Sequence, residues 1–337
     1  MKILLDCLGG DKAPEEAIKG IAYALGKDKD IEIVAIGPAK TTKEGLERLG
    51  ADASRVSYID AAEAVLNTDH PSLFLKQKPN SSLAKAYEEL RGKDEYGALV
   101  SAGPTGAILT GAILRLGRLK GVSRPCLMAT LPTRTGKLVR LLDAGANMDC
   151  KPEYLLQFAL MADTYLRCIG IENPRIGLLN VGMEEGKGNE LTKAAHELIK
   201  GAGLNFVGNI EGDHVLKGEA DVIVCDGFAG NVFIKSTEEA CYYISDMFKE
   251  AIFKNALTKF GALFQIKGLK AVKKPFEFAR KACAPLLGTK KLVLKCHGKA
   301  NAETFGETLL EAKRLLDGDI LAKIGDKIAN SLQTAAK

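Results

Sequence analysis

The amino-acid sequence predicts an α/β fold, a three-layer α/β/α arrangement around a mainly parallel sheet. Apolar β-rich runs alternate with segments of helical spacing along most of the chain. The 35 glycines against 11 prolines suit tight turns between strands and helices, and the lack of tryptophan points to an aliphatic core. Because no linker, repeat or low-complexity stretch interrupts the chain, we expect a single α/β unit over residues 1–337 with no clean internal boundary.

Nine apolar runs are predicted as strands, with a helix between most of them. Helix starts are indicated by Pro14 before two glutamates, by Ser81 or Ser82, by Pro152 and by Asn189. Parallel strands joined through helices form a sheet that is covered on both faces. The runs are KILLD (2–6), IEIVAIG (31–37), RVSYID (55–60), GALVSAG (97–103), LVRLLDAGAN (138–147), RIGLLNVG (175–182), NFVGNI (205–210), DVIVCDG (221–227) and KLVLKCHG (291–298).

Six of the predicted strands are followed by loops of glycines and polar residues. The carboxyl ends of parallel strands share one edge of a sheet, where ligands bind, so these loops can converge on one site. Glycines let backbone N–H groups approach a small anion closely, which describes an oxyanion or phosphate pocket. The alternative is that these residues only form turns and helix caps. The loops begin at Asp6, Ser101, Asp143, Asn180, Asp226 and His297.

Familiar catalytic motifs are absent from the sequence. No GxGxxG follows the first strand, and GMEEGK (182–187) is one residue short of a P-loop and lacks the following Ser or Thr. Neither HExxH nor GxSxG occurs, which argues against a zincin and an α/β-hydrolase. The eight cysteines form no CxxC pair and read as reduced core residues of a cytosolic protein. We therefore expect no cofactor and no metal.

Two charged or titratable residues stand out beside these loops. Lys187 lies among Gly186, Gly188 and Asn189, where its ammonium can meet a phosphate or a developing oxyanion, although pairing with a nearby glutamate is equally open. His297 follows an apolar strand and precedes a glycine, where an imidazole can exchange protons near neutral pH. A purely structural histidine is the alternative.

A basic, amphipathic helical segment is predicted over residues 241–278. From Lys249 to Lys299 the chain has 13 Lys or Arg and 2 Asp or Glu, which favours an anionic partner, and no nucleic-acid motif accompanies this charge. The apolar bulk flanked by lysines suits a helical hairpin on an anionic membrane, at a second subunit or against an acidic carrier protein; a buried core helix is the alternative. The contact residues would be Phe253, Leu257, Phe260, Phe264, Lys267 and Lys270.

Seven segments, in order over nearly the whole chain, resemble the PlsX family of phosphate acyltransferases. They are DCLGGDKAP, SAGPTGA with GAILRLGRLKGVSRP, LLDAGANMDCKPEYLLQFALM, IENPRIGLLNVGMEEGKGNEL, GNIEGDHV, VCDGFAGNV and APLLGTKKLVLKCHG. The resemblance implies transfer of a fatty acyl group from acyl-acyl-carrier-protein to inorganic phosphate, which gives acyl phosphate for phospholipid synthesis. It also implies a fold related to isocitrate and isopropylmalate dehydrogenases and to phosphotransacetylases. Pro104 departs from the family pattern, which usually has Asn there, and Met183 with Gly186 varies the usual acid-rich loop.

The same resemblance implies a homodimer in the cytoplasm, held peripherally at the inner face of the cell membrane, that supplies a downstream acyl-phosphate-using acyltransferase. Phosphate attack on a thioester requires a pocket for the anion and donors for the oxyanion, but neither a metal nor a covalent nucleophile. We assign catalytic roles to Lys187, His297, Asn189 and Asp226. Phosphate or acyl contacts are assigned to Asp6, Gly10, Ser101, Gly103, Thr105, Gly106, Asp143, Asn147, Asn180, Gly188, Gly230 and Asn231.

Two other classes of function stay open. An NAD-dependent dehydrogenase of the isocitrate or isopropylmalate type would share the sheet architecture, but would need a dinucleotide site and clustered aspartates for a metal. A non-catalytic lipid-surface regulator would use the basic segment, yet would have no need of six polar loops at the sheet edge.

Overall fold

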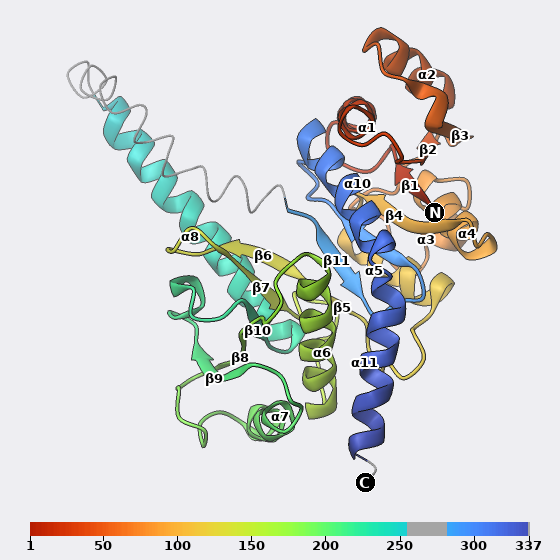
Figure 1. Ribbon diagram of the computed structural model, residues 1–337. Coiled ribbons are helices and arrows are strands. Elements are labelled where there is room, and N and C mark those ends of the chain that lie inside the picture. The colour runs from red at the N-terminus through yellow and green to blue at the C-terminus, as the bar shows by residue number, and fades with distance from the viewer. Residues whose placement is uncertain (255–281, 336–337) are drawn as a thin grey trace.

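The computed structural model describes residues 1–254 and 282–335, and its strands form two mainly parallel sheets (Figure 1). The first sheet has the strand order β3-β2-β1-β4-β12-β11-β5, and the second has the order β6-β7-β10-β8-β9. In the first sheet β11 is antiparallel to both neighbours, and in the second β6 is antiparallel to β7. The predicted α/β class is confirmed, and the strands are divided between two sheets where we expected one.

All nine predicted strands are present, together with three short strands that the sequence did not indicate, β5, β6 and β11. The strands are β1 (Lys2–Asp6), β2 (Ile33–Gly37), β3 (Val56–Asp60), β4 (Tyr96–Ser101), β5 (Cys126–Leu127), β6 (Ala129–Pro132), β7 (Leu138–Leu142), β8 (Ile176–Asn180), β9 (Phe206–Glu211), β10 (Val222–Val224), β11 (Ala284–Leu287) and β12 (Leu292–Lys295). The helices are α1 (Glu15–Lys27), α2 (Ala39–Arg48), α3 (Phe74–Gln77), α4 (Ser82–Gly92), α5 (Thr105–Gly111), α6 (Pro152–Cys168), α7 (Glu190–Lys200), α8 (Gly227–Phe253), α10 (Ala302–Asp317) and α11 (Ile320–Ala335).

Alternate residues of the central strands enter two different cores, because successive side chains of a strand point to opposite faces. Ile3 and Leu5 of β1 pack in one core cluster with apolar side chains of α1 and α10. Leu4 packs in the other cluster with side chains of α4 and α5. The first sheet is therefore covered on both faces, which explains why its parallel strands read as continuous apolar runs.

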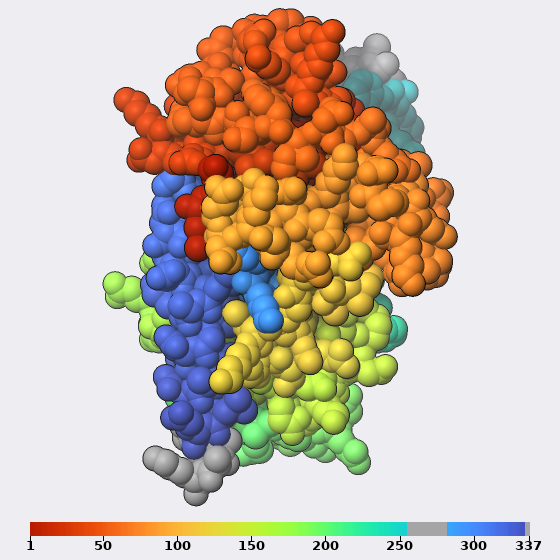
Figure 2. Space-filling model, turned by 90° about the vertical axis from the view of Figure 1, so that its right-hand side faces the viewer, coloured from red at the N-terminus to blue at the C-terminus, as the bar shows by residue number. Residues whose placement is uncertain are grey.

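The two sheets share one of these cores. The cluster that contains Ile3 and Leu5 also contains Leu142 of β7, Leu178 of β8 and Phe158 of α6. Helix α11 packs along α6, so the carboxyl-terminal helices connect the two sheets (Figure 1). Seen from the side, α10 and α11 lie as one blue column against the amino-terminal half of the chain (Figure 2).

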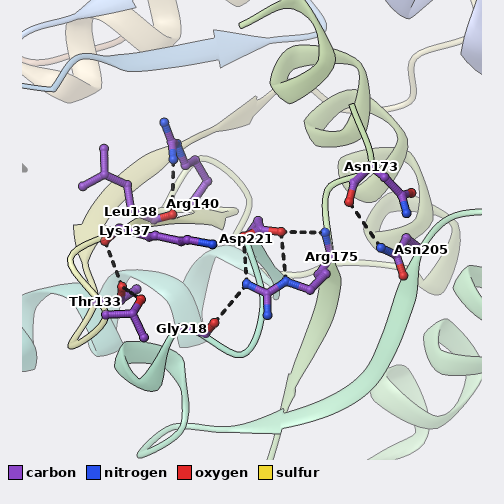
Figure 3. A network of polar contacts seen from close by, with 10 residues as sticks. Thr133, Lys137, Leu138, Arg140, Asn173, Arg175, Asn205, Gly218 and Asp221 are labelled. Carbon is purple, nitrogen blue, oxygen red and sulfur yellow. Dashed lines mark hydrogen bonds and ion pairs between the residues drawn. The ribbon is translucent and has the colours of Figure 1, made fainter. Parts of the chain in front are cut away.

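The amino-terminal edge of the second sheet is fixed by an ion pair. Arg175, just before β8, donates from Nε and one terminal nitrogen to the two carboxylate oxygens of Asp221, just before β10, at 3.1 and 2.9 Å (Figure 3). The same guanidinium donates to the carbonyl of Gly218 at 2.9 Å. These contacts hold β8 and β10 in register, and the polar loops of interest lie at the other edge.

Helix α8 starts at the carboxyl end of β10 and extends well away from both sheets (Figure 1). The predicted helix from residue 241 is confirmed up to Phe253 and begins earlier, at Gly227. Its outer part exposes large apolar side chains, with Tyr243 at 65% and Phe248 at 58% exposure. The hairpin predicted beyond α8, with Leu257, Phe260, Phe264, Lys267 and Lys270, lies outside the described residues.

No helix in the described ranges is both long enough and apolar enough to span a bilayer.

Candidate functional site

The carboxyl edge of the first sheet is organised around the buried carboxylate of Asp6. It accepts hydrogen bonds from the hydroxyls of Ser82 and Ser101 at 2.6 and 2.7 Å and from the amides of Leu8 and Gly9, both at 3.1 Å. Burial raises the pKa of Asp6 although all four donors favour its charged form. Because these donors occupy both oxygens, Asp6 orders the loops of this edge, and the predicted substrate contact stays a prediction.

Three loops meet at this edge. The amide of Asp11 donates to the carbonyl of Gly298 at 2.8 Å, which joins the loops after β1 and β12. A Cβ atom on Gly9 would lie 2.7 Å from both the Asp6 carboxylate and the amide nitrogen of Gly103, so the loops after β1 and β4 touch there. Gly10 has a φ of +103°, which an L side chain rarely adopts.

Helix α5 opens toward the same loops without a side-chain cap. Pro104 precedes its first residue, Thr105, and cannot donate or accept through its side chain. The first amides of a helix have no partner within the helix, so those of Thr105 and Gly106 can bind an anion. The amide of Gly103 is already bonded to the hydroxyl of Ser101, at 3.0 Å.

His297 is exposed at the end of β12. Its Nδ1 lies 3.1 Å from the amide of Lys299, which can only donate, so a neutral ring carries its proton on Nε2. This position suits the predicted exchange of protons at the sheet edge.

The second sheet repeats the arrangement with Asp143 at the end of β7. Its carboxylate accepts from the amides of Leu127, Ala146 and Asn147 at 2.9, 3.1 and 2.6 Å and from the Asn147 side chain at 2.8 Å. Burial raises the pKa of Asp143 as well. Since Leu127 belongs to β5 of the first sheet, this aspartate also connects the two sheets.

The start of α8 packs directly on the Asp143 loop. Asp226 caps the helix by accepting from the amide of Ala229 at 2.8 Å, and the amide of Gly227 donates to the carbonyl of Asn147 at 2.8 Å. A Cβ atom on Gly230 would lie 1.9 Å from the Asp143 carbonyl oxygen, so only glycine fits. Asn231 lies against Gly145, which has a φ of +123°.

Lys187 lies in an exposed loop between β8 and α7. The side-chain amide of Asn180 donates to the Lys187 carbonyl at 3.1 Å, and Gly188 follows with a φ of +97°. Asn189 caps α7 through the amide of Thr192 at 2.9 Å. The cap role predicted for Asn189 is confirmed, and its catalytic role stays a prediction.

Strand register brings the loops of the second edge together. Leu142 of β7 and Leu178 of β8 both pair with Val224 of β10, so β7 and β10 end at one level and β8 continues two residues further, to Asn180. Neighbouring strands lie about 4.8 Å apart, which places Leu142 and Leu178 roughly 10 Å from each other across β10. The loops that start at Asp143, Asn180 and Asp226 therefore line one edge.

Helix α8 links the two edges. It begins at the second edge, and its Lys235 and Glu238 lie within electrostatic reach of Lys295, the last residue of β12 in the first sheet. The structure thus groups the six predicted loops into two clusters of three that α8 connects. Their convergence on one ligand stays a prediction.

Lys295 is a further candidate at the first edge that the sequence analysis did not name. Burial lowers the pKa of its ammonium, Cys296 and Glu238 oppose this, and Lys235 adds to the lowering. A lysine that ends an apolar strand directly before a Cys-His-Gly turn was a usable signal, because the carboxyl ends of parallel strands form ligand sites.

The cysteine thiols fit a structural role, since all eight cysteines are free. Burial raises the pKa of Cys126 and of Cys225, which disfavours the nucleophilic thiolate. Within residues 1–254 and 282–335, no three His, Cys, Asp or Glu side chains are grouped so that they could hold a metal ion.

The fold belongs to a class that solved acyl-transferring and dehydrogenase structures share. A phosphotransacetylase (EutD) from Staphylococcus aureus has a TM-score of 0.58 at 15% identity, with 94% of each chain covered. A 4-hydroxythreonine-4-phosphate dehydrogenase from Klebsiella pneumoniae has a TM-score of 0.51 at 14% identity, covering 94% of this chain and 97% of that one. At such identities the likeness concerns the fold alone.

Sequence relatives define the family. Residues 1–323 match the model of a family described as "Fatty acid synthesis protein". A phosphate acyltransferase from Caldanaerobacter subterraneus subsp. tengcongensis is 45% identical over 329 residues, which cover 97% of each chain. Another, from Acetivibrio thermocellus, is 40% identical over 331 residues, with 98% of this chain and 97% of that one covered. The chain belongs to this family of phosphate acyltransferases, as its resemblance predicted.

Proposed function

We propose that this protein transfers a fatty acyl group from acyl-acyl-carrier-protein to inorganic phosphate and releases acyl phosphate for phospholipid synthesis. Family membership supports the acyl transfer to phosphate. The structural observation that carries the proposal is the pair of aspartate-ordered loop clusters at Asp6 and Asp143, joined by α8. Two adjoining clusters suit a reaction that brings two substrates together.

The first edge suits phosphate. Its loops are glycine-rich and packed closely, and the uncapped amides of Thr105 and Gly106 offer donors to a small dianion. Lys295 adds positive charge at the same edge. A phosphate held there would have its oxygens ordered before the acyl group arrives.

The second edge suits the acyl thioester. Val181, Phe228 and Val232 remain 81%, 64% and 51% exposed beside its polar loops, so apolar surface is available for an acyl chain. Lys187, Asn189 and Asn231 bring an ammonium and amide groups to the same edge, where they would stabilise the oxygen that becomes negative.

The reaction needs no covalent enzyme intermediate. A phosphate oxygen forms a bond to the thioester carbon, the carbon–sulfur bond breaks, and the proton of hydrogen phosphate ends on the released thiol. The thiol has a solution pKa of roughly 8.5, so its departure requires only modest acid assistance. His297, with its Nε2 proton, is our candidate for that assistance.

The experiment that tests the function is incubation of the protein with acyl-acyl-carrier-protein and labelled phosphate. We expect labelled acyl phosphate and an equal amount of free carrier thiol. Absence of both products from correctly folded protein would remove the proposal and favour a non-catalytic lipid-surface role. Reduction of a nicotinamide cofactor with hydroxy acids instead would establish the dehydrogenase alternative.

We also propose that the exposed outer part of α8 is the partner surface, used for a homodimer or for the inner face of the cytoplasmic membrane. Tyr243, Met247 and Phe248 are 65%, 53% and 58% exposed, which gives the outer part of α8 an apolar surface of the kind that partners cover. Flotation with anionic liposomes, comparing wild type with Met247→Glu/Phe248→Glu, separates the two uses. Unchanged flotation alongside an intact dimer would contradict the membrane contact.

A further inference from the structure

Lys295 lies in a row with Asp6 and Ser101 across three neighbouring strands of the first sheet. Ser101 pairs with Lys295 in the register of β4 and β12. Leu5 pairs with Val100, so Asp6 and Ser101, the last residues of β1 and β4, are level. The row is therefore the last one before the loops of the candidate site.

All three side chains of this row lie on the same face of the sheet. Residues two apart on a strand share a face, and Leu4, Leu99 and Val293, each two residues before the row, belong to one core cluster. The hydrogen bond from Ser82 of α4 to Asp6 confirms that this face is the one α4 covers. Lys295 thus projects from the same face as the ordered Asp6 network.

The ammonium of Lys295 makes fewer hydrogen bonds with the described residues than it has donors. It is partly buried, and in the described part of the chain it donates one hydrogen bond, to the carbonyl of Cys296 at 2.9 Å. None of the ion pairs formed among the described residues includes it. A lysine ammonium has three donors, so two are available to another group. Withdrawing a cation from water without a direct ion pair is unfavourable, so this position suits an anionic ligand, although Glu238 lies within electrostatic reach.

A second lysine adds positive charge to the same place. Lys235 of α8 is within electrostatic reach of Lys295, and it pairs with Glu238 at 3.7 Å while keeping 74% of its side chain exposed. Since α8 starts at the second edge, a ligand between these lysines would lie where the two edges adjoin. That is where a phosphate must lie to attack an acyl group held at the second edge.

We propose that Lys295 is the principal cation of the phosphate site, with Lys235 at its rim. This inference rests on the proposed function, because it names the residue that holds one of the two substrates. It differs from the assignment made from sequence, in which Lys187 alone supplied the charge. Lys187 is then left to the acyl side of the reaction.

Lys295→Met and Lys295→Arg test the proposal, with Lys291→Met as the matched control. Lys291 immediately precedes the same strand, at its opposite end, and donates to the backbone carbonyls of Tyr96 and Lys93. Binding of inorganic phosphate alone is measured by calorimetry, and the KM values for phosphate and acyl donor by steady-state kinetics. We expect Lys295→Met to weaken phosphate binding and to raise its KM at least tenfold, with the acyl-donor KM within twofold. Lys295→Arg should restore most of the binding, and Lys291→Met should stay within twofold of wild type.

Phosphate binding within twofold of wild type in folded Lys295→Met would overturn the proposal. If that variant does not fold, brief acetylation of the wild-type protein answers the same question by mass spectrometry. Phosphate should protect Lys295 and not Lys291, and lack of protection would equally overturn it. A wild type that binds phosphate through Lys295 but forms no acyl phosphate would contradict the proposed function and leave the site standing.

Discussion

The carboxyl edges of the two sheets share one device and differ in what surrounds it. At each edge a buried aspartate accepts four hydrogen bonds and orders the adjoining loops, Asp6 in the first sheet and Asp143 in the second. The first edge adds serine hydroxyls and a partly buried ammonium, whereas the second adds side-chain amides, an exposed lysine and exposed apolar groups. On the proposed function, these differences would fit the first edge to a small dianion and the second to a larger acyl donor.

Replacing Gly230 by alanine should have the largest effect on stability and activity, because it disrupts the packing of the second edge. The added Cβ would lie 1.9 Å from a carbonyl oxygen of the Asp143 loop, a contact that requires α8 to move. We expect at least about 3 kcal/mol of destabilisation, as for severe overpacking, and loss of acyl transfer. Urea denaturation with Gly186→Ala as control measures it, because a Cβ on Gly186 meets no atom within 4 Å. Equal midpoints for the two variants would contradict the packing described here.

The substitutions Asp6→Asn and Asp143→Asn compare the two edges directly. Either change replaces a carboxyl oxygen that accepts from the surrounding donors by an amide N–H that faces them, so we expect each variant to lose about 2–4 kcal/mol of stability. In folded protein at low temperature, Asp6→Asn should raise the phosphate KM and Asp143→Asn the acyl-donor KM. Steady-state kinetics with both substrates varied decides this. Equal effects of both variants on both KM values would refute the specialisation.

Lys187→Ala should act on the acyl side. Loss of a donor aimed at a developing oxyanion typically costs about 10²–10³ in kcat, and the exposed position of Lys187 reduces the expected loss to about tenfold. The phosphate KM should stay within threefold of wild type. If acyl-phosphate formation stayed within twofold of wild type, Lys187 would have no catalytic role.

Raising the pH should weaken phosphate binding at the first edge. Burial lowers the pKa of Lys295 below its ordinary 10.5, so its ammonium loses its proton as the pH rises through that lowered pKa. Phosphate binding should therefore fall on the alkaline side, while the lysine's contribution to the free energy of unfolding rises with pH between the lowered pKa and 10.5. Lys295→Arg should move the alkaline loss of phosphate affinity to higher pH, because a guanidinium stays protonated. An unmoved profile in that variant would exclude Lys295 as its origin.

The sequence predicted the parallel strands and most helix starts, because these depend on local patterns. Ser81 and Asn189 do cap α4 and α7, as their positions suggested. The short strands β5, β6 and β11 were missed since prolines precede or interrupt them, and Pro285 even lies within a strand that has neighbours on both sides. Residues 126–132 supply both β5 of the first sheet and β6 of the second, so the division into two sheets depended on these unpredicted elements.

The candidate site was predictable in its loops and less so in its roles. The glycines and aspartates at the strand ends do lie at the carboxyl edges of the sheets, as predicted, because parallel topology alone brings them there. The carboxylates of Asp6 and Asp143 accept hydrogen bonds from Ser82 and Leu127, respectively. Because these donors are distant in sequence, local patterns did not reveal the structural role of the two aspartates. Lys295 was missed for a related reason: its burial and its approach to Lys235 of α8 depend on tertiary packing, which no local pattern encodes.

Pro104→Asn tests the smallest difference between the edges, the absence of a side-chain cap on α5. At the second edge Asp226 and Asn189 cap their helices, whereas Pro104 leaves the first turn of α5 uncapped. A side-chain cap adds about 1 kcal/mol to the free energy of unfolding. Removing proline also gives the unfolded chain more conformational freedom, which lowers the free energy of unfolding by about 0.4–1 kcal/mol. Pro104→Ala loses the proline without adding a cap. The free energy of unfolding of Pro104→Asn, measured by urea denaturation, should therefore be about 1 kcal/mol higher than that of Pro104→Ala. If the two variants have equal free energies of unfolding, the side-chain oxygen of the new asparagine does not accept from the backbone N–H groups of α5. The first edge then differs from the second in its backbone as well as in its side chains.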